Sequence, residues 1–180
     1  MDVKTYPVWA LVALGLVLTG FGCDWVAPAN ETEEVRAVYP LDGEKRLWVE
    51  TFNGAVEVRG ADRADVEMVA VKRAVSREAL GAIDVEVTEM PEGLRIRASR
   101  SSGYRGPAGV DLTLEVPRDA ALDMVQSSNG RVYVSGVRGP ARLRTSNGSV
   151  EAERTGQLEI RTSNGRIDVR DVAGPVEATT

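Results

Sequence analysis

The triplet Ser-Asn-Gly returns at a nearly fixed spacing in the second half of the chain, and this repeat limits the possible folds more than any other feature. Its copies begin 18 and then 17 residues apart. They comprise Ser128, Asn129, Gly130, Ser146, Asn147, Gly148, Ser163, Asn164 and Gly165. A similar phrase of alternating apolar residues follows each copy. A short, fixed period of this kind predicts a repeat architecture in which equivalent segments stack on one another.

Each repeat holds a second glycine corner about half a period after the first. Short runs of alternating apolar residues lie between the corners, such as Val132 and Val134, then Ala141 and Leu143. Period-2 alternation is typical of strands that bury one face. The pattern predicts an all-β, single-domain β-solenoid of flattened, parallel coils. At the corners, asparagine and glycine both tolerate positive φ at low steric cost. Asparagines of stacked coils would lie about 4.8 Å apart and form a ladder.

An alternative treats each Asn-Gly as the two-residue turn of a hairpin, which predicts an antiparallel β-meander. We favour the solenoid because identity over whole repeats is natural for stacked coils and unnecessary for hairpins. The last copy, residues 174–180, stops where the next Ser-Asn-Gly would begin. This favours a fragment truncated at the C-terminus over an open end that docks on a partner.

A further copy of the motif begins at Asn53 and Gly54, and residues 53–60 match residues 129–136 position by position. The section between the two copies is not repeated. Strands are expected there at 66–75, 82–88, 94–98 and 110–116, after a first strand at 46–51. Ser76 is the expected N-cap of one or two helical turns over 76–82. The β-solenoid domain is therefore placed at 44–180.

The N-terminus has the features of an export signal. Residues 8–21 form an apolar run of 14 residues, which is short for a membrane-spanning helix and suits a signal peptide over 1–22. Cys23, the chain's one cysteine, follows directly and resembles the lipidated cysteine of bacterial lipoproteins. Residues 23–43 are polar and acidic, which predicts a flexible tether. We expect a lipoprotein anchored in a bacterial membrane, facing the periplasm or the exterior.

The amino-acid composition disfavours two classes of function, nucleic-acid binding and histidine-based catalysis. A net charge of −5 disfavours a dedicated nucleic-acid binder. The chain has no histidine, so the commonest general base and metal ligand is missing. We expect no enzyme activity, no metal and no cofactor. A polysaccharide-processing enzyme would need grouped carboxylates, for which Glu151 and Asp168 are the candidates. Neighbouring acids on a sheet are more often ordinary surface.

The stacked register also predicts which outward charges face each other. Glu153 would face Arg170, and Arg142 would face Glu159, which is favourable. Glu151 would face Asp168 and Arg144 would face Arg161, which is not. Exposed pairs contribute about 0–1 kcal/mol each, so they do not decide stability. The row formed by Arg144, Arg161 and Gln126 could bind an anionic glycan or a lipid headgroup, or it could be a solvated face that prevents aggregation.

The chain resembles a large bacterial family of putative adhesins, a domain of unknown function. The resemblance rests on residues 111–118, which lead into 122–124, and on the repeated Thr-Ser-Asn-Gly phrases. It implies a non-enzymatic β-solenoid of the cell envelope, with an envelope glycan or protein as partner. The expected function is that of an adhesin-like or scaffold domain. The alternative is an envelope-stress sensor that binds a peptide or protein through a solenoid edge.

Overall fold

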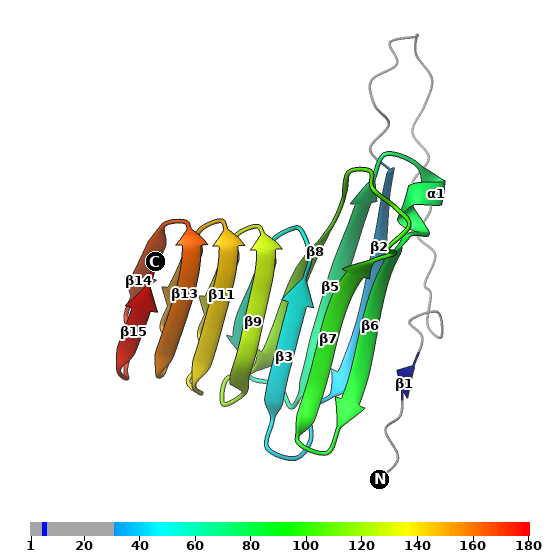
Figure 1. The fold of residues 1–180 in the computed structure, drawn as a ribbon. Coiled ribbons are helices and arrows are strands. Elements are labelled where there is room, and N and C mark those ends of the chain that lie inside the picture. Colours follow the sequence, from blue (N-terminus) through cyan, green and yellow to red (C-terminus); the bar gives the residue numbers. More distant parts are fainter. Residues whose placement is uncertain (1–4, 7–30) are drawn as a thin grey trace, which may run out of the picture.

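Two mixed β-sheets and one short helix make up the described part of the chain, residues 5–6 and 31–180, in the computed structural model (Figure 1). The predicted signal segment 1–22 lies almost entirely outside the described residues, and the predicted lipidation site Cys23 lies outside them. Within these described residues, all secondary structure is β apart from helix α1 (Arg77–Leu80).

The first sheet has eight strands and the second has seven. In spatial order, the first contains β1 (Thr5–Tyr6), β6 (Ile83–Met90), β7 (Gly93–Arg100), β3 (Arg46–Thr51), β9 (Ala121–Asn129), β11 (Ala141–Asn147), β13 (Leu158–Asn164) and β15 (Val176–Thr179). The second contains β14 (Ile167–Arg170), β12 (Val150–Glu153), β10 (Val132–Ser135), β4 (Val56–Ala61), β8 (Ala108–Pro117), β5 (Asp65–Ala74) and β2 (Glu31–Pro40).

Equivalent strands of successive repeats pair in parallel. In the first sheet β11 lies between β9 and β13, with Asn147 opposite Asn129 on one side and Asn164 on the other. In the second sheet β12 lies between β10 and β14 in the same way. Figure 1 shows β9, β11, β13 and β15 side by side toward the C-terminal end. Because hairpins would pair these strands antiparallel, the meander alternative is wrong for the repeats.

The earlier copy of the motif joins the same stack. Strand β4 pairs in parallel with β10, and Val56 lies opposite Val132, as the position-by-position match predicts. Antiparallel pairs, β6 with β7 and β5 with both β2 and β8, extend the sheets beyond the repeats. The expected helical turn is confirmed, since the Ser76 hydroxyl accepts a hydrogen bond from the Ala79 N–H at 3.2 Å.

The inward-facing side chains of both sheets form one apolar core. Along each strand buried residues alternate with exposed or half-buried ones, as in Ala141, Leu143 and Thr145 of β11. Fully buried branched residues such as Val132 and Ile160 each contribute about 1.5–3 kcal/mol relative to exposure. This core holds both outer faces rigid.

The prediction of a flexible tether over 23–43 is wrong for its second half. Residues Glu31–Pro40 form β2, which pairs with β5 along its whole length. Val35, Ala37 and Tyr39 alternate along β2 and pack against the core. The acidic residues of this segment suggested a solvated tether and obscured the alternation. In the structure one of them, Glu33, forms an ion pair with Lys72 at 3.5 Å. Residues 31–40, which were assigned to the tether, therefore belong to the folded domain.

The corners also differ from the expected geometry. None of the described asparagines has a positive φ. Instead, left-handed backbone occurs at equivalent places just after β10, β12 and β14, at Gly136 (φ 69°), Arg154 (φ 52°) and Asp171 (φ 53°). Glycine is required at the Asn-Gly corners mainly because the preceding coil leaves no space for a side chain. A Cβ on Gly130, Gly148 or Gly165 would collide with the carbonyl oxygen of the equivalent glycine in the preceding coil.

We expect Arg154→Gly to stabilise the protein by about 0.5–1 kcal/mol. Glycine adopts φ near 52° without the steric cost that arginine bears there, as Gly136 does in the neighbouring coil. Urea unfolding would measure the change. The control is Arg142→Gly, which lies within β11 and should destabilise by about 1 kcal/mol because glycine weakens a strand. A loss of stability in Arg154→Gly would contradict the corner assignment.

Candidate functional site

The outer face of the eight-stranded sheet carries a concentration of arginines over β7, β3, β9, β11 and β13. We call this surface the arginine face. Its cationic residues are Arg46, Arg95, Arg97, Arg142, Arg144 and Arg161. Each points away from the core because it alternates with a buried neighbour, as Arg144 does with Leu143 and Thr145. The backbones of neighbouring strands lie about 4.8 Å apart, so the strands fix where the arginine side chains leave the sheet.

Trp48 lies at the centre of the arginine face on β3. It is half-buried and lies opposite Arg95 of β7 and Met124 of β9. The Arg46 guanidinium is 5.2 Å from the centre of the indole ring, and that of Arg95 is 5.9 Å from it. Both distances are within the range of cation–π attraction. A hydrogen bond to Asp123 raises the pKa of Arg46, which stays charged.

A shallow groove of about 330 Å³ lies beside the far end of β3. Phe52 forms part of its wall, and the Arg100 guanidinium lies 5.7 Å from that ring. Gln126 and Ser128 line the opposite side. Arg97 and Glu50, which pair at 3.8 Å, also line the groove, so it joins an aromatic ring, two cations, one carboxylate and two neutral hydrogen-bonding groups. Sequence reasoning missed both Trp48 and Phe52 as site residues, although outward-facing aromatics on an alternating strand were visible at these positions.

The predicted row of Gln126, Arg144 and Arg161 is confirmed by the strand register. Of the two arginines in this row, only Arg161 has an acidic partner among the described residues. Arg161 lies 3.0 Å from Glu159, which also pairs with Arg142 at 3.1 Å. Within the described part of the chain, Arg144 makes no ion pair, and its neighbours in register are Gln126 and Arg161. Adjacent like charges repel, so an anion over this row would be stabilised.

The asparagines at the corners form a short side-chain ladder next to the arginine face. The Asn147 amide donates to the Asn129 side-chain oxygen at 2.8 Å, and the Asn164 amide donates to that of Asn147 at 3.2 Å. Asn53 differs from them, because its amide donates to the Ala108 carbonyl at 2.7 Å. Ser128, Ser146 and Ser163 lie next to the ladder and are at least partly exposed.

A column of buried hydroxyl residues lies beneath these corners and was not predicted. It consists of Thr51, Ser127, Thr145 and Thr162. The Ser127 hydroxyl donates to the Gly54 carbonyl at 2.8 Å, and that of Thr145 donates to the Gly130 carbonyl at 3.1 Å. These two hydroxyls thus tie one coil to the coil before it, whereas the buried Thr162 hydroxyl has no hydrogen-bond partner among the described residues. The signal was the position two residues after an inward Val, Leu or Ile.

The candidate acids Glu151 and Asp168 face each other on the outer face of the seven-stranded sheet, as predicted. Each also has an arginine neighbour. Asp168 lies 2.9 Å from Arg170, and Glu151 lies 3.7 Å from Arg131. Tyr133, opposite Glu151 on its other side, carries the Arg131 guanidinium 5.0 Å from its ring centre. These contacts make the pair part of an ordinary ion-paired surface.

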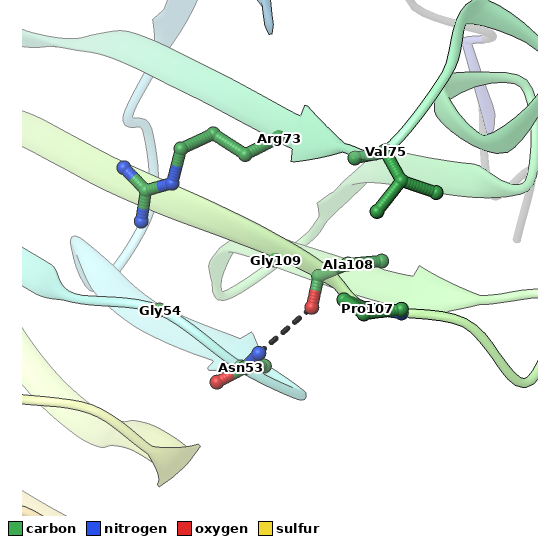
Figure 2. A pocket seen from close by; sticks show the side chains of 8 residues that line it. Asn53, Gly54, Arg73, Val75, Pro107, Ala108 and Gly109 are labelled. Atoms are coloured by element: carbon green, nitrogen blue, oxygen red, sulfur yellow. Dashed lines mark hydrogen bonds between the residues drawn. The ribbon is translucent and has the colours of Figure 1, made fainter. Parts of the chain in front are cut away.

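A separate pocket of about 230 Å³ lies at the corner between Asn53 and Val75 (Figure 2). Figure 2 shows the Asn53 amide turned to the Ala108 carbonyl, with Pro107 and Gly109 on either side of it in sequence. The Arg73 guanidinium pairs with Asp111 at 2.7 Å. Since both polar groups already have partners, the arginine face is the stronger candidate for binding.

Residues 5–6 and 31–180 contain no cluster of three or more Asp, Glu, Cys or His side chains placed to hold a metal ion. This described part of the chain also contains no helix that has the length and apolar character needed to cross a membrane.

No family model matches the chain, and no match was found among curated proteins. Three solved structures show a distant resemblance. A putative cell adhesion protein from Clostridium sporogenes has 8% identity and a TM-score of 0.45. Putative adhesins from Bacteroides fragilis and Parabacteroides merdae have 8% and 6% identity, with TM-scores of 0.29 and 0.28. Each comparison covers 82% of this chain and 97% of the other. We base the functional proposal on this chain's own residues.

Proposed function

We propose that the protein is a non-enzymatic, lipid-anchored interaction protein of the cell envelope, adhesin-like or a scaffold. The observation that carries the proposal is the arginine face, which presents Trp48 and a row of outward cations on a rigid sheet. Such a surface can bind an extended partner without any moving part. The paired state of Glu151 and Asp168 supports a binding role over a catalytic one.

The repeats are proposed to be coils of a β-solenoid. Support comes from the parallel register of β9, β11 and β13 in one sheet and of β10, β12 and β14 in the other. In this arrangement every coil contributes one strand to each outer face. A partner that spans several coils would therefore meet the same geometry repeatedly.

The envelope location is proposed from the N-terminal sequence. The apolar run at 8–21 ends just before Cys23, where a lipoprotein would be cleaved and acylated. Several acyl chains would hold the protein firmly at a membrane, whereas one chain anchors only marginally. The folded strands described from residue 31 onward would then lie close to that membrane surface.

We expect Cys23→Ser to move the protein from the membrane fraction to the soluble fraction of the cells that produce it. The reason is that serine cannot carry the thioether-linked lipid. Incorporation of a labelled fatty acid, followed by fractionation, would measure the change. The matched control is Asp24→Asn, which keeps the cysteine and should remain labelled. If the wild-type chain incorporates no labelled fatty acid, the proposal of a lipid anchor is wrong.

The interaction role is tested by capture from envelope extract on the immobilised full chain. We expect a glycan or protein to be retained by the wild type and lost when the arginine face is altered by Arg144→Glu and Arg161→Glu. The control is the same chain with Arg59→Glu and Arg170→Glu, which changes charge equally on the other sheet. Equal recovery by all three chains, or no recovery, would argue against the proposal.

A further inference from the structure

We infer that the arginine face binds an acidic polysaccharide, one whose sugar rings carry carboxylates, laid across the strands from β7 toward β13. This inference rests on the proposed function, because it names the class of partner for the same surface. The first step is the geometry of the row. Arg97, Glu50, Gln126, Arg144 and Arg161 occupy neighbouring strands in register. A linear chain running across the strands meets these groups in turn.

The second step is the presence of aromatic rings between the cations. Trp48 on β3 and Phe52 directly after the end of β3 lie four residues apart, and each has an arginine near its ring. The C–H face of a sugar ring packs on an indole or phenyl face, while its carboxylate pairs with the adjacent guanidinium. Arg95 lies 5.9 Å from the centre of the Trp48 ring and Arg100 lies 5.7 Å from that of Phe52, so a cation is close to each ring.

The third step is charge. Among the described residues, Arg95 and Arg144 have no acidic partner, and Arg144 faces Arg161 in register. Guanidinium groups bind carboxylates in bidentate geometry, so two carboxylates of a polymer would neutralise charges that the protein leaves uncompensated. On the outer face of the other sheet, the corresponding row consists of Glu57, Tyr133, Glu151 and Asp168 and contains no cation. Its three acids pair with neighbouring arginines, so the row offers no uncompensated positive charge to the polymer.

The fourth step distinguishes a glycan from a lipid surface. A protein face that inserts into a membrane presents large apolar side chains. The exposed large apolar residues of the described chain are Val38, Val75 and Val176, and all three lie away from the arginine face. That face instead offers hydroxyl and amide groups beside its cations, at Ser128, Ser146 and Gln126. These groups suit the hydroxyls of sugars.

The test uses the full chain with Cys23→Ser and three probes: polygalacturonate, neutral dextran and phosphatidylglycerol vesicles. Calorimetry at low and moderate salt should show binding of polygalacturonate that weakens with salt, and no binding of dextran. Arg144→Gln with Arg161→Gln should weaken binding about tenfold or more. The matched control, Arg59→Gln with Arg170→Gln, removes the same charge from the other sheet and should change it by about twofold or less.

A second pair of variants tests the aromatic contact. Trp48→Ala should weaken polygalacturonate binding about tenfold, whereas Trp48→Phe should retain most of it because a ring remains. Circular dichroism would verify that each variant is folded. No binding of polygalacturonate, or an equal loss in the control pair, would overturn the inference. The inference would also be overturned if the protein bound phosphatidylglycerol vesicles as well as polygalacturonate and if Arg144→Gln with Arg161→Gln weakened both equally. If the protein does not bind polygalacturonate but still captures a partner from the envelope extract, the ligand class inferred here is wrong and the proposed interaction function stands.

Discussion

Gly148→Ala is expected to destabilise the protein by about 2–5 kcal/mol. The backbone of Gly148 has a φ of 157°, and an added Cβ would lie 2.6 Å from the Gly130 carbonyl carbon and collide with its oxygen. Relief would require the two coils to separate, which would disturb the Asn147 to Asn129 hydrogen bond. Overpacking costs about 1–3 kcal/mol, and backbone strain adds to it. Urea unfolding would measure the loss.

Gly103→Ala is the matched control for this prediction. An added Cβ at Gly103 would meet no atom within 4 Å, so the free energy of unfolding should change by less than about 1 kcal/mol. The comparison removes the general effect of replacing glycine by alanine. Equal stabilities for the two variants would mean that neighbouring coils are not in close backbone contact at the Asn-Gly corners.

The repeat and its register could be predicted because they follow from spacing alone. Once Asn147 and Asn164 are aligned, the pairs of β11 with β13 are fixed by counting, including Arg144 opposite Arg161. Between β9 and β11 counting fails past Leu143, because the register shifts by one residue there. The reason for glycine at the corners could not be predicted in this way. Gly130 and Gly165 lack positive φ, and their need for glycine arises from the carbonyl of the coil before. This close contact between a glycine and the carbonyl group of the preceding coil can be recognised only in the three-dimensional structure.

The arginine face was predicted only in part. Arg144 and Arg161 belong to the repeats, so periodicity brought them together. Trp48, Phe52 and Arg95 come from the non-repeating section, and their position depends on β3 pairing with both β7 and β9. Nothing in local sequence specifies that β3 is inserted between these strands. Strand β2 was missed for a related reason, since its pairing with β5 outweighs its acidic composition.

A disulfide between Arg144→Cys and Arg161→Cys is the second large effect that we expect. The two residues face each other on adjacent parallel strands, where strand spacing of about 4.8 Å suits the Cα separation of a disulfide. In a Cys23→Ser background these are the protein's two thiols. The bond closes a loop of about 17 residues, and oxidation should therefore stabilise the fold by about 3 kcal/mol.

The same measurement tests the central claim, that repeats pair in parallel and in register. The comparison is Arg144→Cys with Glu151→Cys, because a hairpin turning at Asn147 and Gly148 would place those two residues opposite each other. In the structure they lie on different sheets, in β11 and β12. Mild oxidation followed by mass spectrometry should show rapid cross-linking of 144 with 161 and none of 144 with 151. Cross-linking of 144 with 151 but not with 161 would contradict the account.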